Sequence, residues 1–170
     1  MRTGRALLIG AFALLGACTA TAPLSAAGDV HAFLVSIRDD DKAAFNAHVD
    51  RKALKAQLRD KLAADAARRD PALGALAVAL GPPLIDIAVD KLVQPEFFRE
   101  TAEALGYSPD KPLPSSLAIA EALRPIDDSH VCVARKKDAP CLFVFTDEDG
   151  VWRLTAIEGA SDLLRRAVKD

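Results

Sequence analysis

Two cysteines near the end of the chain could form a covalent cross-link. Cys132 and Cys141 are separated by eight residues, with Lys136-Lys137 at the centre of the segment between them. In a hairpin with that tip, position 132 faces position 141, and directly opposed residues lie about 4.5–5.5 Å apart at Cα, within disulfide range. We therefore predict a Cys132–Cys141 cross-strand disulfide. The alternative is two buried free thiols, whereas a metal site would need a histidine or a third thiol beside the pair.

The third cysteine, Cys18, follows an apolar run at the start of the chain. Arg2 and Arg5 precede that run, which covers residues 6–17. A basic start, a short apolar run and small residues at its end are typical of a secretory signal peptide, whereas spanning a bilayer takes about 20 apolar residues. The ending Leu15-Gly16-Ala17-Cys18 resembles the lipobox of bacterial lipoproteins. We therefore predict a signal peptide over residues 1–17 and lipidation of Cys18.

A second cleavage position competes with lipidation. Ser25-Ala26-Ala27 has the small residues that signal peptidases accept. Cleavage there would give a soluble periplasmic or secreted protein that starts at Gly28, whereas lipidation gives a membrane-anchored lipoprotein facing the periplasm. Both outcomes export the protein to a compartment in which disulfides persist. We expect residues 18–28 to be the lipidated cysteine and a flexible tether, because they are rich in Ala, Thr, Ser and Pro, and residues 29–170 to form one domain.

Residues suited to acid–base chemistry are present but form no catalytic motif. Asp86 and Asp90 lie one helical turn apart, and we interpret them as solvated surface residues, because a catalytic pair needs a cleft that gives each carboxylate a different environment. His31, His48 and His130 are scattered along the chain. No nucleophile elbow, zinc motif, dinucleotide motif or phosphate loop occurs. We predict no catalytic residue, no metal site and no cofactor, and we assign no ligand-binding residue.

Composition narrows the classes of partner. The chain has 22 basic and 24 acidic residues, a net charge of −2 that becomes −4 when Arg2 and Arg5 leave with the signal peptide. Because no basic cluster stands out, nucleic acid is not an expected partner. The aromatic residues are few, with seven Phe, one Tyr and one Trp. We therefore expect closely packed alanine-rich helices rather than a deep aromatic ligand cage.

Apolar residues at helical spacing predict a series of helices before residue 125. Asp29 is the expected N-cap of the first helix, and Asp39-Asp40-Asp41 a solvated junction in which one aspartate caps the second. Val49-Asp50 starts a third helix that runs to about Arg69. Further helices are expected in a buried hairpin over 71–93, then over 95–105 and 115–123, and a last one over 161–168.

After Pro125 the apolar period changes to two, which predicts strands near 131–134, 142–145 and 152–156. Asp147-Glu148-Asp149-Gly150 is an expected turn between the last two strands. Trp152 is expected in the core where helices meet the sheet. The predicted fold class is α+β, with a helical N-terminal part followed by a three-stranded antiparallel β-meander and a C-terminal helix.

The order of several short motifs resembles a bacterial family, the domain of unknown function 2939. These motifs are Arg38-Asp39-Asp40-Asp41, Val49-Asp50, Ala53-Leu54-Lys55-Ala56-Gln57-Leu58, Ile87-Ala88-Val89-Asp90, Val93-Gln94-Pro95-Glu96 and Val151-Trp152-Arg153-Leu154. The resemblance spans about Val30 to Ile157. Because members of that family are exported or membrane-anchored and have no assigned chemistry, it implies an envelope location and adds no catalytic residue.

Three functions remain open at this point. The first is a non-enzymatic, lipid-anchored cell-envelope protein that binds an envelope protein partner or a small apolar ligand, the latter in a pocket like those of cystatin-like or nuclear-transport-factor-like folds. The second is a small pocketed enzyme of the hydrolase or lyase type in the periplasm, which would need His130, Arg153 or an aspartate in the cavity. The third, a structural spacer, would have neither a pocket nor an apolar surface patch.

Overall fold

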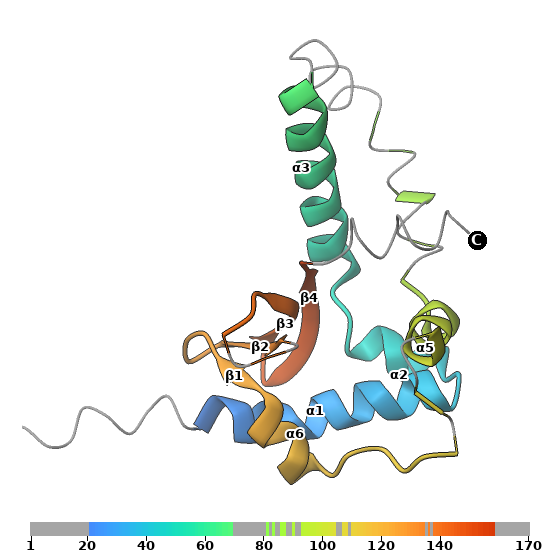
Figure 1. Cartoon of the computed structure of the whole chain (residues 1–170), viewed down its shortest axis with the longest axis vertical. Helices are drawn as coiled ribbons and strands as arrows, with labels where there is room; N and C mark the ends of the chain where they lie inside the picture. Colours follow the sequence, from blue (N-terminus) through green and yellow to red (C-terminus); the bar gives the residue numbers. More distant parts are fainter. Residues whose placement is uncertain are drawn as a thin grey trace, which may run out of the picture.

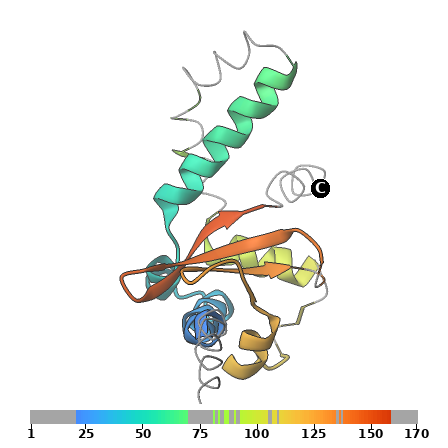
Figure 2. The same ribbon diagram turned by 90° about the vertical axis from the view of Figure 1, so that its left-hand side faces the viewer.

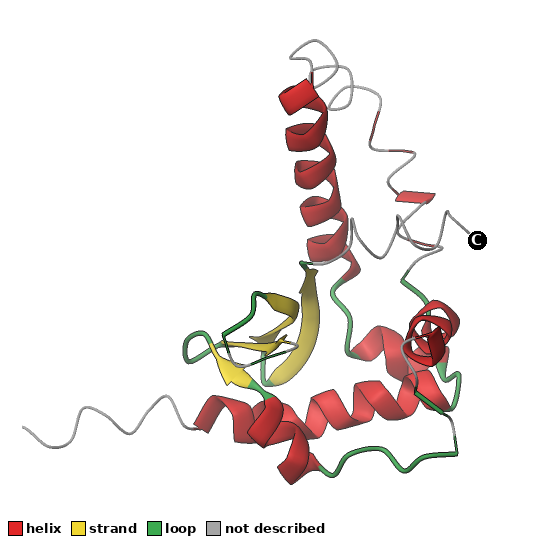
Figure 3. Ribbon diagram, in the orientation of Figure 1, coloured by secondary structure: helices red, strands yellow, loops and turns green. Residues whose placement is uncertain are grey.

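The protein has an α+β fold in which helices precede an antiparallel sheet (Figure 3). The computed structural model describes residues 21–69, 81, 83, 86, 87, 90, 93–104, 107, 108, 110–134, 136 and 138–158. The helices are α1 (Thr21–Arg38), α2 (Lys42–Ala47), α3 (Arg51–Arg69), α5 (Pro95–Ala104) and α6 (Ser116–Ala122). The strands are β1 (Arg124–Pro125), β2 (His130–Ala134), β3 (Cys141–Glu148) and β4 (Val151–Ile157), in the spatial order β1-β2-β3-β4.

The sheet has four strands, and the prediction of three was wrong. The additional strand, β1, is two residues long and pairs Arg124 with Cys132 and Pro125 with Val131. Such a strand is too short to produce an alternating pattern, and its proline fits an edge position because proline cannot donate to a ladder. The expected C-terminal helix over 161–168 and most of the expected helical hairpin over 71–93 lie outside the described residues.

Helix α1 begins well before the expected start of the domain. It includes residues 21–28, with Ala22, Ala26 and Ala27 at most 3% exposed. The expected flexible tether is therefore wrong for these residues. Alanine is the best helix former, and the i, i+4 spacing of Ala22 and Ala26 places both on one face of the helix. The predicted signal peptide over residues 1–17 and the lipidation site Cys18 lie outside the described residues.

The prediction that Asp29 caps the first helix was wrong. Asp29 links α1 to the sheet instead. It lies inside α1, and its carboxylate accepts a hydrogen bond of 2.9 Å from the backbone N–H of Trp152 in β4. Trp152 is 2% exposed, which confirms its predicted place in the core. Helix α1 is seen end-on below the sheet in Figure 2, with α6 beside it.

The segment before α3 is also tied to β4. The backbone N–H of Leu154 donates to the carbonyl of His48 at 2.9 Å, and the N–H of Asp50 donates to the carbonyl of Leu154 at 3.0 Å. Asp50 then caps α3 by accepting from the N–H groups of Lys52 and Ala53. From this attachment α3 runs outward, and its C-terminal half points away from the sheet (Figures 1 and 2).

Helix junctions and turns follow the local signals in the sequence. Asp41 accepts from the N–H groups of Ala43 and Ala44, so the acidic junction does cap α2 as predicted. Ser115 caps α6 in the same way. At the predicted acidic turn, Asp149 and Gly150 have φ angles of 56° and 85°, the positive values that a tight hairpin turn requires. The predicted cap of the second helix, the predicted start of the helix at residue 115 and the predicted turn over 147–150 are therefore confirmed.

Six of the seven phenylalanines form one cluster. The ring of Phe33 lies 5.4 Å from that of Phe45 and 5.7 Å from those of Phe98 and Phe145. Phe97 and Phe143 extend the cluster through their contacts with Phe98. The cluster joins α1, α2, α5 and β3. The few aromatic residues of the chain therefore form an aromatic cluster, because the fold brings them together from distant parts of the sequence.

We expect Phe45→Ala to reduce the free energy of unfolding by about 3–5 kcal/mol, since Phe45 is fully buried against two other rings. Urea denaturation followed by circular dichroism measures the change. Leu24→Ala is the control in α1, because Leu24 is 62% exposed and its truncation should change stability by less than about 0.5 kcal/mol. Equal effects of the two substitutions would contradict the assigned core.

Candidate functional site: an apolar cavity between the helices and the sheet

A cavity of about 450 Å³ lies between the helices and the sheet. Residues of α1, α3, α5, α6, β2, β3 and β4 line it, together with the segment that follows α5. Its volume is within the range of small-molecule sites, about 300–1,000 Å³. Representative apolar lining residues are Phe33, Leu58, Phe98, Ile119, Val133 and Phe143.

The helix periodicities that predicted a core also produce this lining. In α1, Val30, Phe33, Leu34 and Ile37 recur at the spacing of one helical face, and all four line the cavity. No feature of the sequence distinguishes residues that fill a core from residues that surround a cavity. Both have the same apolar pattern, and the difference arises only from how far apart the elements lie.

Five polar residues line the cavity: Arg38, Gln57, Lys61, Thr101 and Tyr107. Among the described lining residues, both ionisable charged side chains are cationic, and none is Asp, Glu or His. The hydroxyl of Thr101 donates to the carbonyl of Phe97 at 2.8 Å, within its own helix. The polar groups left to meet a ligand therefore belong to the Gln57–Lys61 group or to the Arg38–Tyr107 group.

The Gln57–Lys61 group is occupied by contacts with the end of β4. The side chain of Gln57 accepts from the N–H of Ile157 at 2.9 Å and donates to the carboxylate of Glu158 at 3.1 Å. The ammonium of Lys61 donates to the carboxylate and the carbonyl of Glu158, each at 3.1 Å. These contacts fix α3 to β4, so their role is structural.

The Arg38–Tyr107 group is only partly satisfied. Nε and Nη2 of Arg38 donate to the carboxylate of Asp39 at 2.7 and 3.1 Å. This hydrogen bond and the charge of Asp39 raise the pKa of Arg38, and nearby Tyr107 adds a smaller contribution of the same sign. The same hydrogen bond lowers the pKa of Asp39. The hydroxyl of Tyr107 is buried and has no hydrogen-bond partner among the described residues.

Sequence reasoning missed Tyr107, which it assigned to a proline-rich loop. The available signal was that this is the chain's one tyrosine, placed beside a segment that connects two amphipathic helices. A buried tyrosine hydroxyl usually has a hydrogen-bond partner. Only the structure shows that the hydroxyl of Tyr107 has none among the described residues.

The Asp86/Asp90 pair lies on the surface, as predicted. Their side chains are 58% and 57% exposed, and both contact the ammonium of Lys55, at 3.4 and 3.2 Å. Asp90 also lies 3.7 Å from the guanidinium of Arg51. The hydrogen bond with Asp90 is the main cause of the raised pKa of Lys55. The pair therefore holds α3 against the segment before α5.

The histidines and Arg153 lie outside the cavity lining. His130 Nδ1 is 2.7 Å from Asp127, whose pKa is lowered mainly by this hydrogen bond. Arg153 pairs with Glu148 at 2.8 Å, and His48 lies 3.8 Å from Asp29. None of the described lining residues is His130, Arg153 or an aspartate, the residues whose presence in the cavity would favour an enzyme. Among the described residues, no group of His, Cys, Asp and Glu is placed to hold a metal ion.

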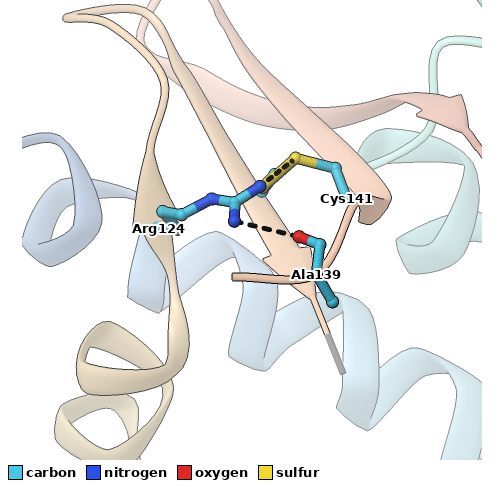
Figure 4. The surroundings of a disulfide bond; sticks show 4 residues. Arg124, Ala139 and Cys141 are labelled. Carbon is cyan, nitrogen blue, oxygen red and sulfur yellow. Dashed lines mark hydrogen bonds between the residues drawn. A yellow bond between two sulfur atoms is a disulfide. The ribbon is translucent and has the colours of Figure 1, made fainter. Parts of the chain in front are cut away.

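The predicted disulfide is present between Cys132 and Cys141, with their Cα atoms 5.6 Å apart (Figure 4). The predicted register is wrong, because Cys132 lies opposite Val144 and Cys141 opposite Ala134. A register shift between Val133 and Ala134 separates the two cysteines along the ladder. The bond therefore joins offset positions rather than a directly facing pair.

Arg124 supports the disulfide from the edge strand. One guanidinium nitrogen donates to Cys141 Sγ and another to the carbonyl of Ala139, both at 3.0 Å (Figure 4). Cys132 is fully buried. The bond and these contacts together fix the β2–β3 connection against β1.

A comparison with protein families identifies the chain's relatives. The family described as "Protein of unknown function (DUF2939)" matches residues 12–101, more than half of the chain. The chain belongs to this family. The DUF2939 match ends inside α5, so the resemblance expected for Val151-Trp152-Arg153-Leu154 lies beyond it. The cavity of this DUF2939 protein combines matched elements, α1, α3 and part of α5, with the sheet that follows.

No match was found among curated proteins or among solved structures. Within the described part of the chain, no helix has both the length and the hydropathy needed to cross a membrane.

Replacing both disulfide cysteines with alanine should lower the free energy of unfolding by about 2–3 kcal/mol, because the bond closes a short loop and limits the unfolded chain. Denaturation of the oxidised protein and of the Cys132→Ala/Cys141→Ala variant, with and without reductant, measures this. Reductant should destabilise only the parent protein. Titratable thiols at Cys132 and Cys141 in protein isolated without reductant would contradict the disulfide.

Proposed function

We propose that this protein is a non-enzymatic, lipid-anchored cell-envelope protein that binds a small apolar ligand in the cavity between its helices and its sheet. The single observation that carries the proposal is the cavity of about 450 Å³ with its largely apolar lining. Protein interiors are close-packed, and voids larger than a water molecule are few. A space of this size within one domain is therefore better explained as a binding site than as a packing defect.

The chemistry of the lining supports binding rather than catalysis. Catalytic sites bring together acids, bases or nucleophiles whose pKa values are tuned by one another. In the described lining, four of the five polar groups contact other parts of the chain, and the acidic groups with shifted pKa values, such as Asp127, lie elsewhere. Apolar cavities exclude water and take up apolar molecules, which is the activity we propose here.

The position of α1 supports anchoring through Cys18 over cleavage after Ala27. Cleavage after Ala27 would remove the first seven residues of α1, including the buried Ala22 and Ala26. Cleavage before Cys18 leaves the whole helix in the mature protein. Only Thr19 and Ala20 separate Cys18 from the helix, so acyl chains on Cys18 would hold the domain within about 10 Å of the membrane.

Metabolic labelling with palmitate in a bacterial host tests the anchor. We expect the full-length protein to be labelled and the Cys18→Ser variant to lose the label. Ala26→Leu is a control that alters the competing cleavage sequence and should remain labelled. Recovery of an unlabelled protein whose first residue is Gly28 would refute anchoring without affecting the proposal of a binding cavity.

Blocking the cavity tests ligand binding. Ala102 lines the cavity from α5, whereas Glu103, the next residue, is exposed and does not line it. We expect Ala102→Trp to weaken binding of diphenylhexatriene, a neutral apolar fluorophore, by about tenfold or more. The indole would occupy part of the cavity, and each carbon of the ligand that is kept out of it loses about 0.8 kcal/mol of burial. Glu103→Trp, which introduces the same side chain, should bind as the parent does.

Fluorescence titration of the mature chain, beginning at Cys18, gives the affinities, and circular dichroism shows whether each variant is folded. If Ala102→Trp does not fold, Ala102→Leu replaces it, with a smaller expected loss. Equal affinities of the folded cavity variant and the Glu103→Trp control would refute the cavity as the binding site.

A further inference from the structure

We propose that the ligand of this cavity is a single-chain amphiphile with an anionic head, whose acyl chain lies in the cavity and whose head group binds at Arg38 and the hydroxyl of Tyr107. This inference rests on the proposed function and specifies the class of ligand. The head group could be the carboxylate of a fatty acid or the phosphate of a lysophospholipid, which share an anionic oxygen cluster on one acyl chain.

The charge of the lining selects the sign of the head group. Its described charged residues, Arg38 and Lys61, are cations, and no described lining residue is acidic. Each cation pairs with a carboxylate, Asp39 or Glu158, that does not itself line the cavity, so an anion inside it would meet the cations rather than these carboxylates. A cationic or zwitterionic head group would gain less, because charge complementarity is what separates related ligands of equal apolar area.

Hydrogen-bond satisfaction selects the location of the head group. Gln57 and Lys61 are bonded to Ile157 and Glu158, and Thr101 is bonded within α5. The Tyr107 hydroxyl, by contrast, is buried without a partner among the described residues. A buried hydroxyl without a partner is unfavourable, and an anionic oxygen accepting from it would supply the partner.

The guanidinium of Arg38 can contribute to the same site. Its Nε and Nη2 are engaged by Asp39, which leaves Nη1 outside that pair, and the side chain is 39% exposed. The backbone N–H of Tyr107 donates to the carbonyl of Ala102 at 3.0 Å, which fixes the tyrosine beside α5. One neutral and one charged donor would then act on a single anion, and hydrogen bonds between charged groups are the stronger kind.

The size of the cavity favours a single chain. About 450 Å³ is near the lower end of the range for small-molecule sites. The lining is apolar on the surfaces contributed by the helices and by the sheet, so an acyl chain would contact apolar groups on all of those sides. A lipid with two chains would leave one of them outside.

Competition with a neutral probe tests the proposal in the mature chain. Bound diphenylhexatriene is displaced by oleic acid, by lysophosphatidic acid with the same chain, or by oleyl alcohol, at pH 8 and below their aggregation concentrations. We expect at least one of the two anionic ligands to bind about tenfold more tightly than the alcohol. The arm that shows this preference identifies the head group as carboxylate, phosphate or either.

Three variants locate the head group. Tyr107→Phe removes only the hydroxyl and should reduce the preference for the anion about threefold or more, while Arg38→Gln should abolish most of it. Lys61→Gln removes the other cation of the lining, which is bonded to Glu158, and should reduce the preference much less than Arg38→Gln does. Without ligand, Tyr107→Phe should unfold at or above the parent's temperature, since the hydroxyl has no partner to lose.

The outcomes separate this inference from the proposed function. If the probe and all three ligands fail to bind, the proposed function itself is wrong. If the alcohol binds as tightly as the anions, or if Lys61→Gln abolishes the preference while Tyr107→Phe and Arg38→Gln keep it, the cavity binds apolar ligands but the head-group site is wrong. A lowered unfolding temperature of ligand-free Tyr107→Phe would also overturn the role of that hydroxyl.

Discussion

The packing of Phe33 is the interaction on which the rest of the structure depends. Its ring contacts those of Phe45 in α2, Phe98 in α5 and Phe145 in β3. It thereby joins three helices and the sheet at one point. Stacked and edge-to-face ring pairs contribute about 0.5–1.5 kcal/mol each beyond the area that they bury. With so few aromatic residues in the chain, most of that contribution is concentrated at this one side chain and its neighbours.

The cavity follows from where this cluster lies. Phe33 both fills the core between α1, α2 and β3 and forms part of the cavity lining. Beyond the cluster, α3, α5 and α6 line the cavity together with α1 and the sheet. Lys61 and Gln57 fix α3 to β4, and Asp90 with Lys55 fixes α3 to the segment before α5. These polar links attach α3, which lines the cavity, to its neighbours without involving the phenylalanine rings.

Local structure could be read from the sequence where one side chain determines it. Asp41, Asp50 and Ser115 each cap a helix through their own hydrogen bonds, and the two positive φ values after Glu148 come from a short polar turn. The start of α1 could not be read in this way, because an alanine-rich segment with proline and serine has the composition of a linker until its alanines meet a neighbouring surface. The two-residue strand β1 likewise has no pattern of its own.

Long-range geometry was predictable only in part. The sequence distance between Cys132 and Cys141 was enough to predict their bond, but not the register shift that places them diagonally. The cavity had no signal in the sequence, since lining and core residues share one periodicity. Tyr107 illustrates the limit most directly. Its surroundings include Arg38 of α1, which is distant in the sequence, and Ala102 of α5, an ordinary helix residue, so no local pattern predicts that its hydroxyl is unpaired.

One part of the cavity surface differs in kind from the others. Tyr107, Leu113 and Pro114 line it from the segment between α5 and α6. Apart from Val93 before α5 and Leu123 after α6, the other described lining residues belong to helices and strands. Neither Leu113 nor Pro114 lies in a helix or a strand, and the described backbone hydrogen bonds of this segment are made by Tyr107 and Lys111. Exchanging Leu113 for a larger or smaller apolar side chain would therefore change the room available to a ligand without replacing any residue of a helix or a strand.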